Sequence, residues 1–153
     1  MRPLTPAMVA CLARARDARL TGGLTGMMER ERIALCNRDL LQRAGAPPGS
    51  YGWAASDLGM QVAAEVCPPP DLPTLRAALA ERRREAGAKV ADAEKRLATA
   101  VATMRAALDE PPTTWQQADV LSAQWTMALR FVHEARADLG ALPPLSSLDG
   151  GAQ

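Results

Sequence analysis

The feature that most constrains the fold is the stretch from Thr74 to Leu108, which contains no proline and a single glycine, Gly87. Apolar or small residues recur through it at alternating spacings of three and four, which is the period of a helix that packs along one stripe. At 1.5 Å per residue, such a helix spans roughly 50 Å. We therefore predict one long helix here. Its contact stripe comprises Leu79, Arg83, Ala86, Val90, Ala93, Leu97, Ala100, Met104 and Ala107.

A second long helix is predicted to follow. The sequence Asp-Glu-Pro-Pro at residues 109–112 ends the first helix, since proline cannot donate the backbone hydrogen bond of a helix interior. The next residues offer a capping box, formed by Thr113 with Gln116 or by Thr114 with Gln117. The apolar stripe of the second helix comprises Ala118, Leu121, Trp125, Leu129, Val132, Ala135 and Leu139, with Gly140 at its predicted C-terminal end.

Residues 74–139 are therefore predicted to form an antiparallel, coiled-coil-like helical hairpin. Two helices alone cannot bury both apolar stripes, so the hairpin needs a third surface, either the N-terminal part of the chain or a second copy. A homodimeric four-helix bundle is the simplest way to provide one. The residues expected in self-association are Val90, Leu97, Met104, Leu121, Trp125, Leu129 and Val132.

The N-terminal part, residues 1–67, is predicted to be a separate helical module. Thr5-Pro6 combines an N-cap with a proline suited to the first helical position, and the helix that it opens should stop near Thr21-Gly22-Gly23. A second helical stretch is expected from about residue 25 to residue 44. The pattern leaves open whether this stretch is one helix or two.

A short strand and a last helix are expected to complete this module. Only the segment around residues 50–55 is suited to a strand, and whether it forms one is open. Ser56 is a good cap for a helix that ends before Cys67. Residues 68–73 are interpreted as a stiff, proline-rich linker, and residues 140–153 as a loose C-terminal tail.

Composition also favours a mostly α protein. Hydrophobic residues make up 48% of the chain, and many of them are alanine, whereas aromatic residues make up only 3%. A chain that is rich in alanine and poor in aromatic and β-branched residues is unsuited to a β-sandwich or barrel. No apolar run approaches about 18 residues, so we expect no membrane span.

Cysteine usage and the N-terminus both point to the cytoplasm. Cys11, Cys36 and Cys67 form no CxxC pair and lie far apart in the sequence. They are interpreted as small buried hydrophobic groups in a reducing compartment. The first residues contain no apolar segment of the kind that a signal peptide needs, so no export is expected.

The balance of charge does not by itself indicate a polyanionic partner. The formal net charge is +1, although residues 1–67 carry eight arginines against six acidic residues. The basic run Arg82-Arg83-Arg84 lies between Glu81 and Glu85, which favours a solvated helix face over a phosphate site.

Catalytic and metal-binding patterns are not found in the sequence. His133 is the only histidine, and no cysteine or carboxylate lies at a spacing that would bring it a partner. The glycines at 22, 23 and 26 match neither a Walker A loop nor a GxGxxG fingerprint after a strand. We therefore expect no catalytic residue, no cofactor and no metal site.

Residues 4–66 resemble the small winged-helix proteins of phages and other mobile elements. Leu-Thr-Pro-Ala at residues 4–7 opens the first helix. Residues 38–45, RDLLQRAG, are similar to a recognition helix that ends in glycine. Residues 51–60, YGWAASDLGM, are similar to a wing strand followed by the last helix, although the family usually has Leu-Thr where this chain has Ala55-Ser56.

The resemblance implies a set of DNA contacts. Arg38, Gln42 and Arg43 would face the major groove, while Arg30 and Arg32 would lie near phosphates. Beside these residues, Tyr51 and Trp53 follow a Pro/Gly-rich loop, and large aromatic side chains there either pack the module or form an exposed contact with nucleic acid or a protein partner.

Two functional hypotheses from different classes follow. The first is a non-enzymatic DNA-binding regulatory or accessory protein that dimerises through the helical hairpin. The alternative is a protein-binding inhibitor or adaptor from a phage or mobile element, for example an antagonist of a host defence complex. A small enzyme is a third possibility that no set of residues supports.

Overall fold

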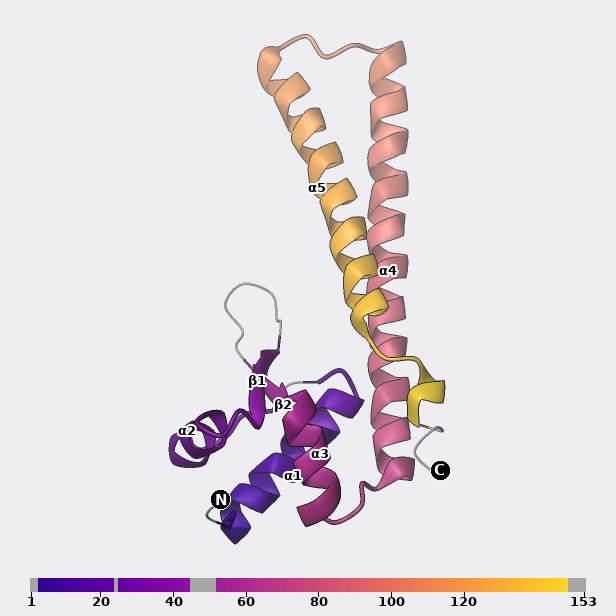
Figure 1. The fold of residues 1–153 in the computed structure, drawn as a ribbon. Coiled ribbons are helices and arrows are strands. Elements are labelled where there is room, and N and C mark those ends of the chain that lie inside the picture. The colour runs from indigo at the N-terminus through magenta and orange to yellow at the C-terminus, as the bar shows by residue number, and fades with distance from the viewer. Residues whose placement is uncertain (1–2, 24, 45–51, 149–153) are drawn as a thin grey trace. The chain divides into compact units, whose positions relative to one another are not determined.

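The computed structural model describes residues 3–23, 25–44 and 52–148, and Figure 1 traces its elements. The protein is mostly helical, as predicted. The chain divides into two compact units, of which residues 1–79 with 143–153 form the first and residues 80–142 form the second. In chain order, the elements are α1 (Pro6–Leu20), α2 (Glu29–Cys36), β1 (Leu41–Ala44), β2 (Gly52–Ala55), α3 (Asp57–Val66), α4 (Leu72–Asp109), α5 (Trp115–Ala141) and the 3-10 helix η1 (Leu145–Leu148).

Helix α1 begins and ends where the sequence predicts. The side chain of Thr5 accepts a hydrogen bond from the backbone N–H of Met8 at 3.3 Å, and Pro6 occupies the first turn. These features satisfy and preorganise a helix N-terminus. The C-cap residue is Thr21, and Gly22 follows with a φ of 63°, a conformation that glycine adopts without steric cost.

The prediction of a helical stretch over residues 25–44 is confirmed only for residues 29–36 and is wrong at both ends. Thr25 forms an isolated bridge with Trp53, α2 covers only Glu29–Cys36, and strand β1 occupies Leu41–Ala44. Pairing with β2 therefore overrides a local sequence that has no strong preference for a strand.

A tight turn separates α2 from β1. The N–H of Leu40 donates to the carbonyl oxygen of Leu35 at 3.1 Å, and the N–H of Asp39 donates to that of Cys36 at 2.9 Å. These two hydrogen bonds form a Schellman motif, in which Asp39 takes the left-handed position with a φ of 57°. Leu35 and Leu40 are both buried, so the hydrophobic core fixes the turn.

Strands β1 and β2 form an antiparallel pair. Residues 52–55 confirm a strand in the expected segment, whereas Tyr51 and the expected turn before it lie outside the described residues. The first strand was not predicted, because Leu-Gln-Arg-Ala contains no β-branched or aromatic residue. The register pairs Leu41 with Ala55, Gln42 with Ala54, Arg43 with Trp53, and Ala44 with Gly52.

The core of the first unit lies between α1, α3 and the strand pair. Ser56 caps α3, as predicted, by accepting a hydrogen bond from the N–H of Gly59 at 2.9 Å. Gly59 approaches the backbone of Leu40 so closely that an added Cβ would lie 2.1 Å from its carbonyl oxygen. Only glycine allows this approach. The buried core side chains are Met8, Cys11, Leu12, Ala15, Leu35, Leu40, Leu41, Ala55 and Ala63.

Helix α4 begins at Leu72, so the predicted linker at residues 68–73 is wrong at its C-terminal end. The carboxylate of Asp71 accepts a hydrogen bond from the backbone N–H of Thr74 at 3.3 Å and one from its hydroxyl at 2.6 Å. These hydrogen bonds lower the pKa of Asp71. Pro73 is tolerated because the N–H groups of the first turn have no intrahelical acceptor.

In the second unit, α5 runs antiparallel to α4 (Figure 1). The N-cap of α5 is Thr114, whose side chain accepts a hydrogen bond from the N–H of Gln117 at 3.3 Å, so the second of the two expected pairs forms. Ala93 packs with Val132 and Ala135 in the seam between the helices. Because these residues are small, the helix backbones can approach closely.

The C-terminal boundaries differ from the prediction. Helix α5 continues through Gly140 to Ala141, so this glycine does not end it. Residues 145–148 form η1, and Leu148 is buried, so the expectation of a loose tail over residues 140–153 is wrong for these residues. Among the described residues, no helix combines the length and the apolar character needed to cross a membrane.

Candidate nucleic-acid interface

Helix α2 has one buried edge and one exposed face. Leu35 is fully buried in the core of the first unit. Arg30, Ile33 and Asn37 are exposed, and their spacings of three and four place them on one face of the helix. This face ends at the turn that contains Arg38, which is half-buried. The first unit therefore presents α2 with a mixed polar surface while the core holds its opposite edge.

Trp53 of β2 connects α2 to the strand pair. The guanidinium of Arg32 stacks over the Trp53 ring at 5.6 Å from its centroid, and it also lies 3.7 Å from the carboxylate of Glu29. The backbone N–H of Thr25 donates to the carbonyl oxygen of Trp53 at 3.3 Å. Arg43 lies directly opposite Trp53 in the register, so the two side chains emerge on the same face of the strand pair. Arg32 therefore contacts the indole ring, and Arg43 lies on the same face of the strand pair.

The predicted recognition helix at residues 38–45 is wrong. Arg38 lies in the turn after α2, while Gln42 and Arg43 are exposed on β1. A helix cannot continue past Asp39, because its left-handed backbone reverses the chain toward β1. The expected contact residues therefore lie on a helix and an adjoining strand, not on one helix.

The candidate surface carries a small positive charge. Between residues 29 and 43, the four arginines 30, 32, 38 and 43 outnumber the three acidic residues 29, 31 and 39, which gives a net charge of +1. A polyanion bound here would therefore contact arginines individually and would not meet a broad basic patch.

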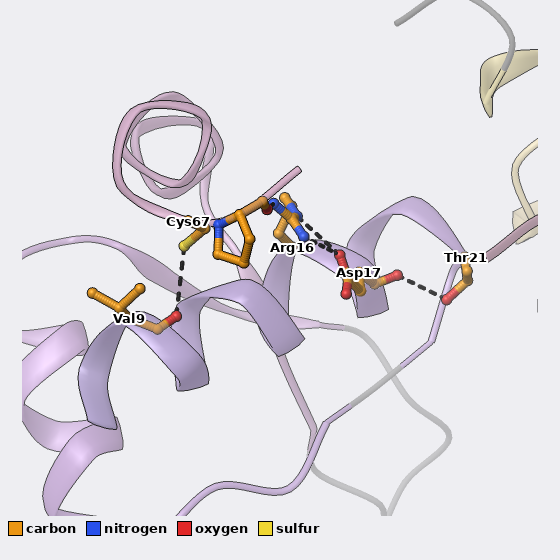
Figure 2. Close-up of polar contacts among 6 residues, drawn as sticks. Val9, Arg16, Asp17, Thr21 and Cys67 are labelled. Atoms are coloured by element: carbon orange, nitrogen blue, oxygen red, sulfur yellow. Dashed lines mark hydrogen bonds and ion pairs between the residues drawn. The ribbon is translucent and has the colours of Figure 1, made fainter. Parts of the chain in front are cut away.

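Arg16 joins the C-terminal half of α1 to the segment after α3 (Figure 2). Its guanidinium is buried and donates to the carbonyl oxygen of Pro68 at 2.6 Å. The Nε atom donates to the carboxylate of Asp17 at 2.9 Å, which keeps the buried charge paired. The carbonyl oxygen of Asp17 in turn accepts a hydrogen bond from the hydroxyl of Thr21 at 2.9 Å.

Arg19 has a similar role at the junction of β2 and α3. It donates to the carbonyl oxygen of Ala55 at 2.8 Å and pairs with the carboxylate of Asp57. The arginines of α1 thus hold the strand pair and α3 in place. They are committed to contacts within the first unit.

Cys67 and Cys36 are both half-buried in the first unit. The Cys67 thiol donates to the carbonyl oxygen of Val9 at 3.5 Å (Figure 2). Burial raises the pKa of the Cys67 thiol, against the lowering effect of Arg16. Burial likewise raises the pKa of Cys36. Both groups therefore remain protonated at neutral pH, which suits small packed side chains and not nucleophiles.

The residues expected in self-association fall into two groups in the second unit. The first group packs within the seam of the hairpin and comprises Val90, Leu97 and Val132. The second group is exposed or half-buried and comprises Met104, Leu121, Trp125 and Leu129. Val90 and Leu97 are themselves only half-buried, so the clearest difference is that Val132 is buried and Met104 is exposed.

Among the described residues, neither the single histidine nor the carboxylates and thiols form a candidate metal site. His133 is exposed on α5. Within residues 3–23, 25–44 and 52–148, no group of three or more His, Cys, Asp and Glu side chains is placed to hold a metal ion.

Sequence reasoning missed Ile33 and Asn37 as surface residues of α2. A signal for the true end of the helix is present, because Leu35 and Leu40 enclose the short polar run Asn-Arg-Asp. In a Schellman turn, two apolar residues five positions apart, here Leu35 and Leu40, enclose a residue that tolerates the left-handed conformation, here Asp39.

Comparisons with known protein families, with curated proteins and with solved structures found no match for this chain. Its function is therefore inferred from its own residues and their geometry.

Proposed function

We propose that this protein is a non-enzymatic regulatory or accessory protein that binds duplex DNA through α2 and the β1–β2 strand pair. The observation that carries the proposal is the exposed face of α2, where Arg30 and Asn37 lie beside Ile33, next to a strand pair that bears Arg43. A helix supported in this way fits the major groove of B-DNA, which is about 12 Å wide. Dimerisation through the helical hairpin is part of the proposal, because two copies can then bind two half-sites.

Each contact residue has a distinct role in this proposal. Arg30 and Asn37 reach base edges, since arginine pairs with guanine and asparagine pairs with adenine in the major groove. Arg38 and Arg43 contact phosphates on either side of the groove. Arg32 is a positioning residue, because its contact with the Trp53 ring holds the strand pair against α2.

Fluorescence anisotropy of a labelled duplex of about three helical turns tests the proposal. The wild-type protein is titrated at about 50 and about 200 mM salt, beside the double variant Arg30→Glu/Arg43→Glu. We expect the slope of log K against log salt to reach about −4 at most, because each of the two first units brings Arg38 and Arg43 to phosphates. We expect the double variant to lose at least about tenfold in affinity, since each arginine becomes repulsive to phosphate.

The matched control is Lys89→Glu/Lys95→Glu, which changes the charge by the same amount on exposed positions of α4. This control should bind DNA as the wild type does. No binding at the lower salt concentration, or an equal loss in both double variants, would contradict DNA recognition through α2.

A second candidate function is that of a protein-binding inhibitor or adaptor. It is favoured by large apolar side chains that are exposed near the loop of the hairpin, with Leu108 83% exposed and Trp115 87% exposed. Such side chains are uncommon on a surface without a partner. A host protein and a second copy of the chain would compete for this surface, so the oligomeric state of the free protein separates the two candidates.

A further inference from the structure

Helices α4 and α5 diverge toward the loop that joins them (Figure 1). Residues on and beside the α4 stripe become more exposed toward the same loop. Ala93 is 5% exposed and Ala100 is 9% exposed, whereas Met104 is 39% exposed and the neighbouring Leu108 is 83% exposed. We call the part of the hairpin from Val101 to Trp125 the open end. The apolar stripe continues in sequence through the open end, but its side chains are half-buried or exposed there and not buried.

The sizes of the seam residues explain the divergence. In the closed part of the hairpin, alanines at 93, 100, 128 and 135 let the helices approach closely. At the open end, the same stripe positions carry Met104 on α4 and Leu121 and Trp125 on α5. The closed seam also holds Leu97, but Trp125 is larger than any side chain there and does not fit between helices packed so closely. Met104, Leu121 and Trp125 are of a size to fill the wider cross-section of a four-helix bundle.

The two faces of the open end differ in chemistry. On one side of the stripe, the next residues along α4 are Val101 and Leu108. Leu108 and Trp125 line two cavities of about 200 and 250 Å³, and Val101 lines the smaller one. On the other side, Thr103 and Gln124 line a groove of about 910 Å³ whose walls mix polar residues with Ala107, Val120, Leu121 and two prolines. The side with the two cavities is therefore the more apolar of the two. We define the apolar face as Val101, Met104, Leu108, Leu121 and Trp125.

We infer that the apolar face binds the apolar face of a second copy of this chain, so that the two open ends form a four-helix bundle. The surface continues the α4–α5 interface along the same stripe and without a break, so it is suited to more helices of the same kind. A second copy supplies two such helices with the same residues. A two-fold contact of this type is self-complementary, because each copy presents the same face to the other.

The charges around the apolar face agree with a second copy as its occupant. Of the residues that line its two cavities, Arg105 is the only charged one. A strongly acidic partner would find only this one complementary charge and a strongly basic partner none, whereas an apolar helix pair needs none. The inference rests on the dimer named in the proposed function, but it does not depend on DNA binding.

Sedimentation equilibrium of the full chain without DNA tests the inference. The wild type, Leu108→Glu and the control Val120→Glu are compared from about 1 to about 100 µM. Both substitutions place a carboxylate on an exposed apolar position of the open end, but Val120 lies on the groove side, outside the apolar face. We expect the wild type and Val120→Glu to form dimers, and Leu108→Glu to weaken the dimer at least about tenfold, because each dimer would bury two carboxylates.

Circular dichroism checks that the helices of all three proteins are intact, which is expected since both side chains are exposed in one chain. A wild type that stays monomeric at the highest concentration would overturn the inference and leave the face to another protein. Equal weakening by both substitutions, or by neither, would overturn it as well. Failure of DNA binding by a wild-type dimer would instead contradict only the proposed DNA contacts.

Discussion

Asp39 determines where α2 ends and where the strand pair begins. Its φ of 57° lies in the left-handed region, which costs an ordinary L-residue roughly 1–2 kcal/mol. Asparagine and aspartate tolerate this region better than most residues, and glycine tolerates it without steric cost. The surrounding core, through Leu35 and Leu40, forces Asp39 into this conformation. Some strain is therefore stored at one exposed residue beside the candidate interface.

We expect Asp39→Gly to stabilise the protein by about 0.5–1 kcal/mol, because glycine removes the strain of the left-handed backbone. Urea denaturation followed by circular dichroism measures the change in the free energy of unfolding. Asp39→Ala serves as the control and should not stabilise, since alanine keeps a Cβ and loses the tolerance of aspartate. A less stable Asp39→Gly would show that the carboxylate makes a contact worth more than the strain.

At the scale of the elements, the position of α3 depends on one close backbone contact. Gly59 has no side chain, and the carbonyl oxygen of Leu40 occupies the place where a Cβ would be. Helix propensity alone would favour alanine over glycine by about 1 kcal/mol in a helix. Packing and propensity therefore oppose each other at this position, and the contact decides the outcome.

We expect Gly59→Ala to destabilise the protein by about 2 kcal/mol or more, because the added methyl group must displace backbone atoms. Gly87→Ala is a matched control in α4, where nothing lies within 4 Å of the added Cβ. The control should stabilise by up to about 1 kcal/mol through helix propensity. Thermal and urea unfolding of both variants measure the difference, and a Gly59→Ala protein as stable as the wild type would contradict the close contact.

The elements that sequence predicted well are those with local signals. Thr5, Ser56 and Thr114 cap α1, α3 and α5 as expected, since an N-cap needs only residues within one turn. Strand β1 escaped prediction because its formation depends on pairing with β2, which is distant in sequence. The first turn of α4 was missed because Pro73 was interpreted as part of a linker, although a first turn accepts proline.

The residues of the candidate interface could be named from local sequence, but their arrangement depends on long-range pairing. Arg30, Arg32, Arg43 and Trp53 were named from sequence, and they lie on α2 and the strand pair. Their arrangement was not predictable, because the contact of Arg32 with the Trp53 ring forms only when β2 pairs beside α2. A local pattern identifies such residues, whereas the turn at Asp39 determines how they meet.

At the scale of the whole molecule, the two units are built on different principles. The first unit has a mixed core of leucine, methionine and alanine under α2 and the strand pair. The second unit has a narrow alanine-rich seam and an apolar open end. Under our proposals, the first unit contacts DNA and the second unit joins two copies. Affinity for DNA would then depend on residues of the second unit that never touch it.

This division of roles predicts an avidity effect. A dimer can place two first units on a duplex of about three helical turns, but only one on a duplex of about one turn. We expect the wild type to bind the longer duplex at least about tenfold more tightly per site, because the second contact becomes intramolecular. Leu108→Glu should lose this gain while binding the shorter duplex as the wild type does, and Val120→Glu should keep it.

Anisotropy titrations of the two duplexes at one salt concentration measure both affinities. A Leu108→Glu protein that binds the shorter duplex more weakly would indicate a damaged first unit, which a parallel unfolding experiment detects. A Leu108→Glu protein that keeps the full gain on the longer duplex would show that the second unit does not couple the two contacts. Because Leu108 lies in the second unit and α2 in the first, only self-association can link this substitution to DNA affinity in a correctly folded chain.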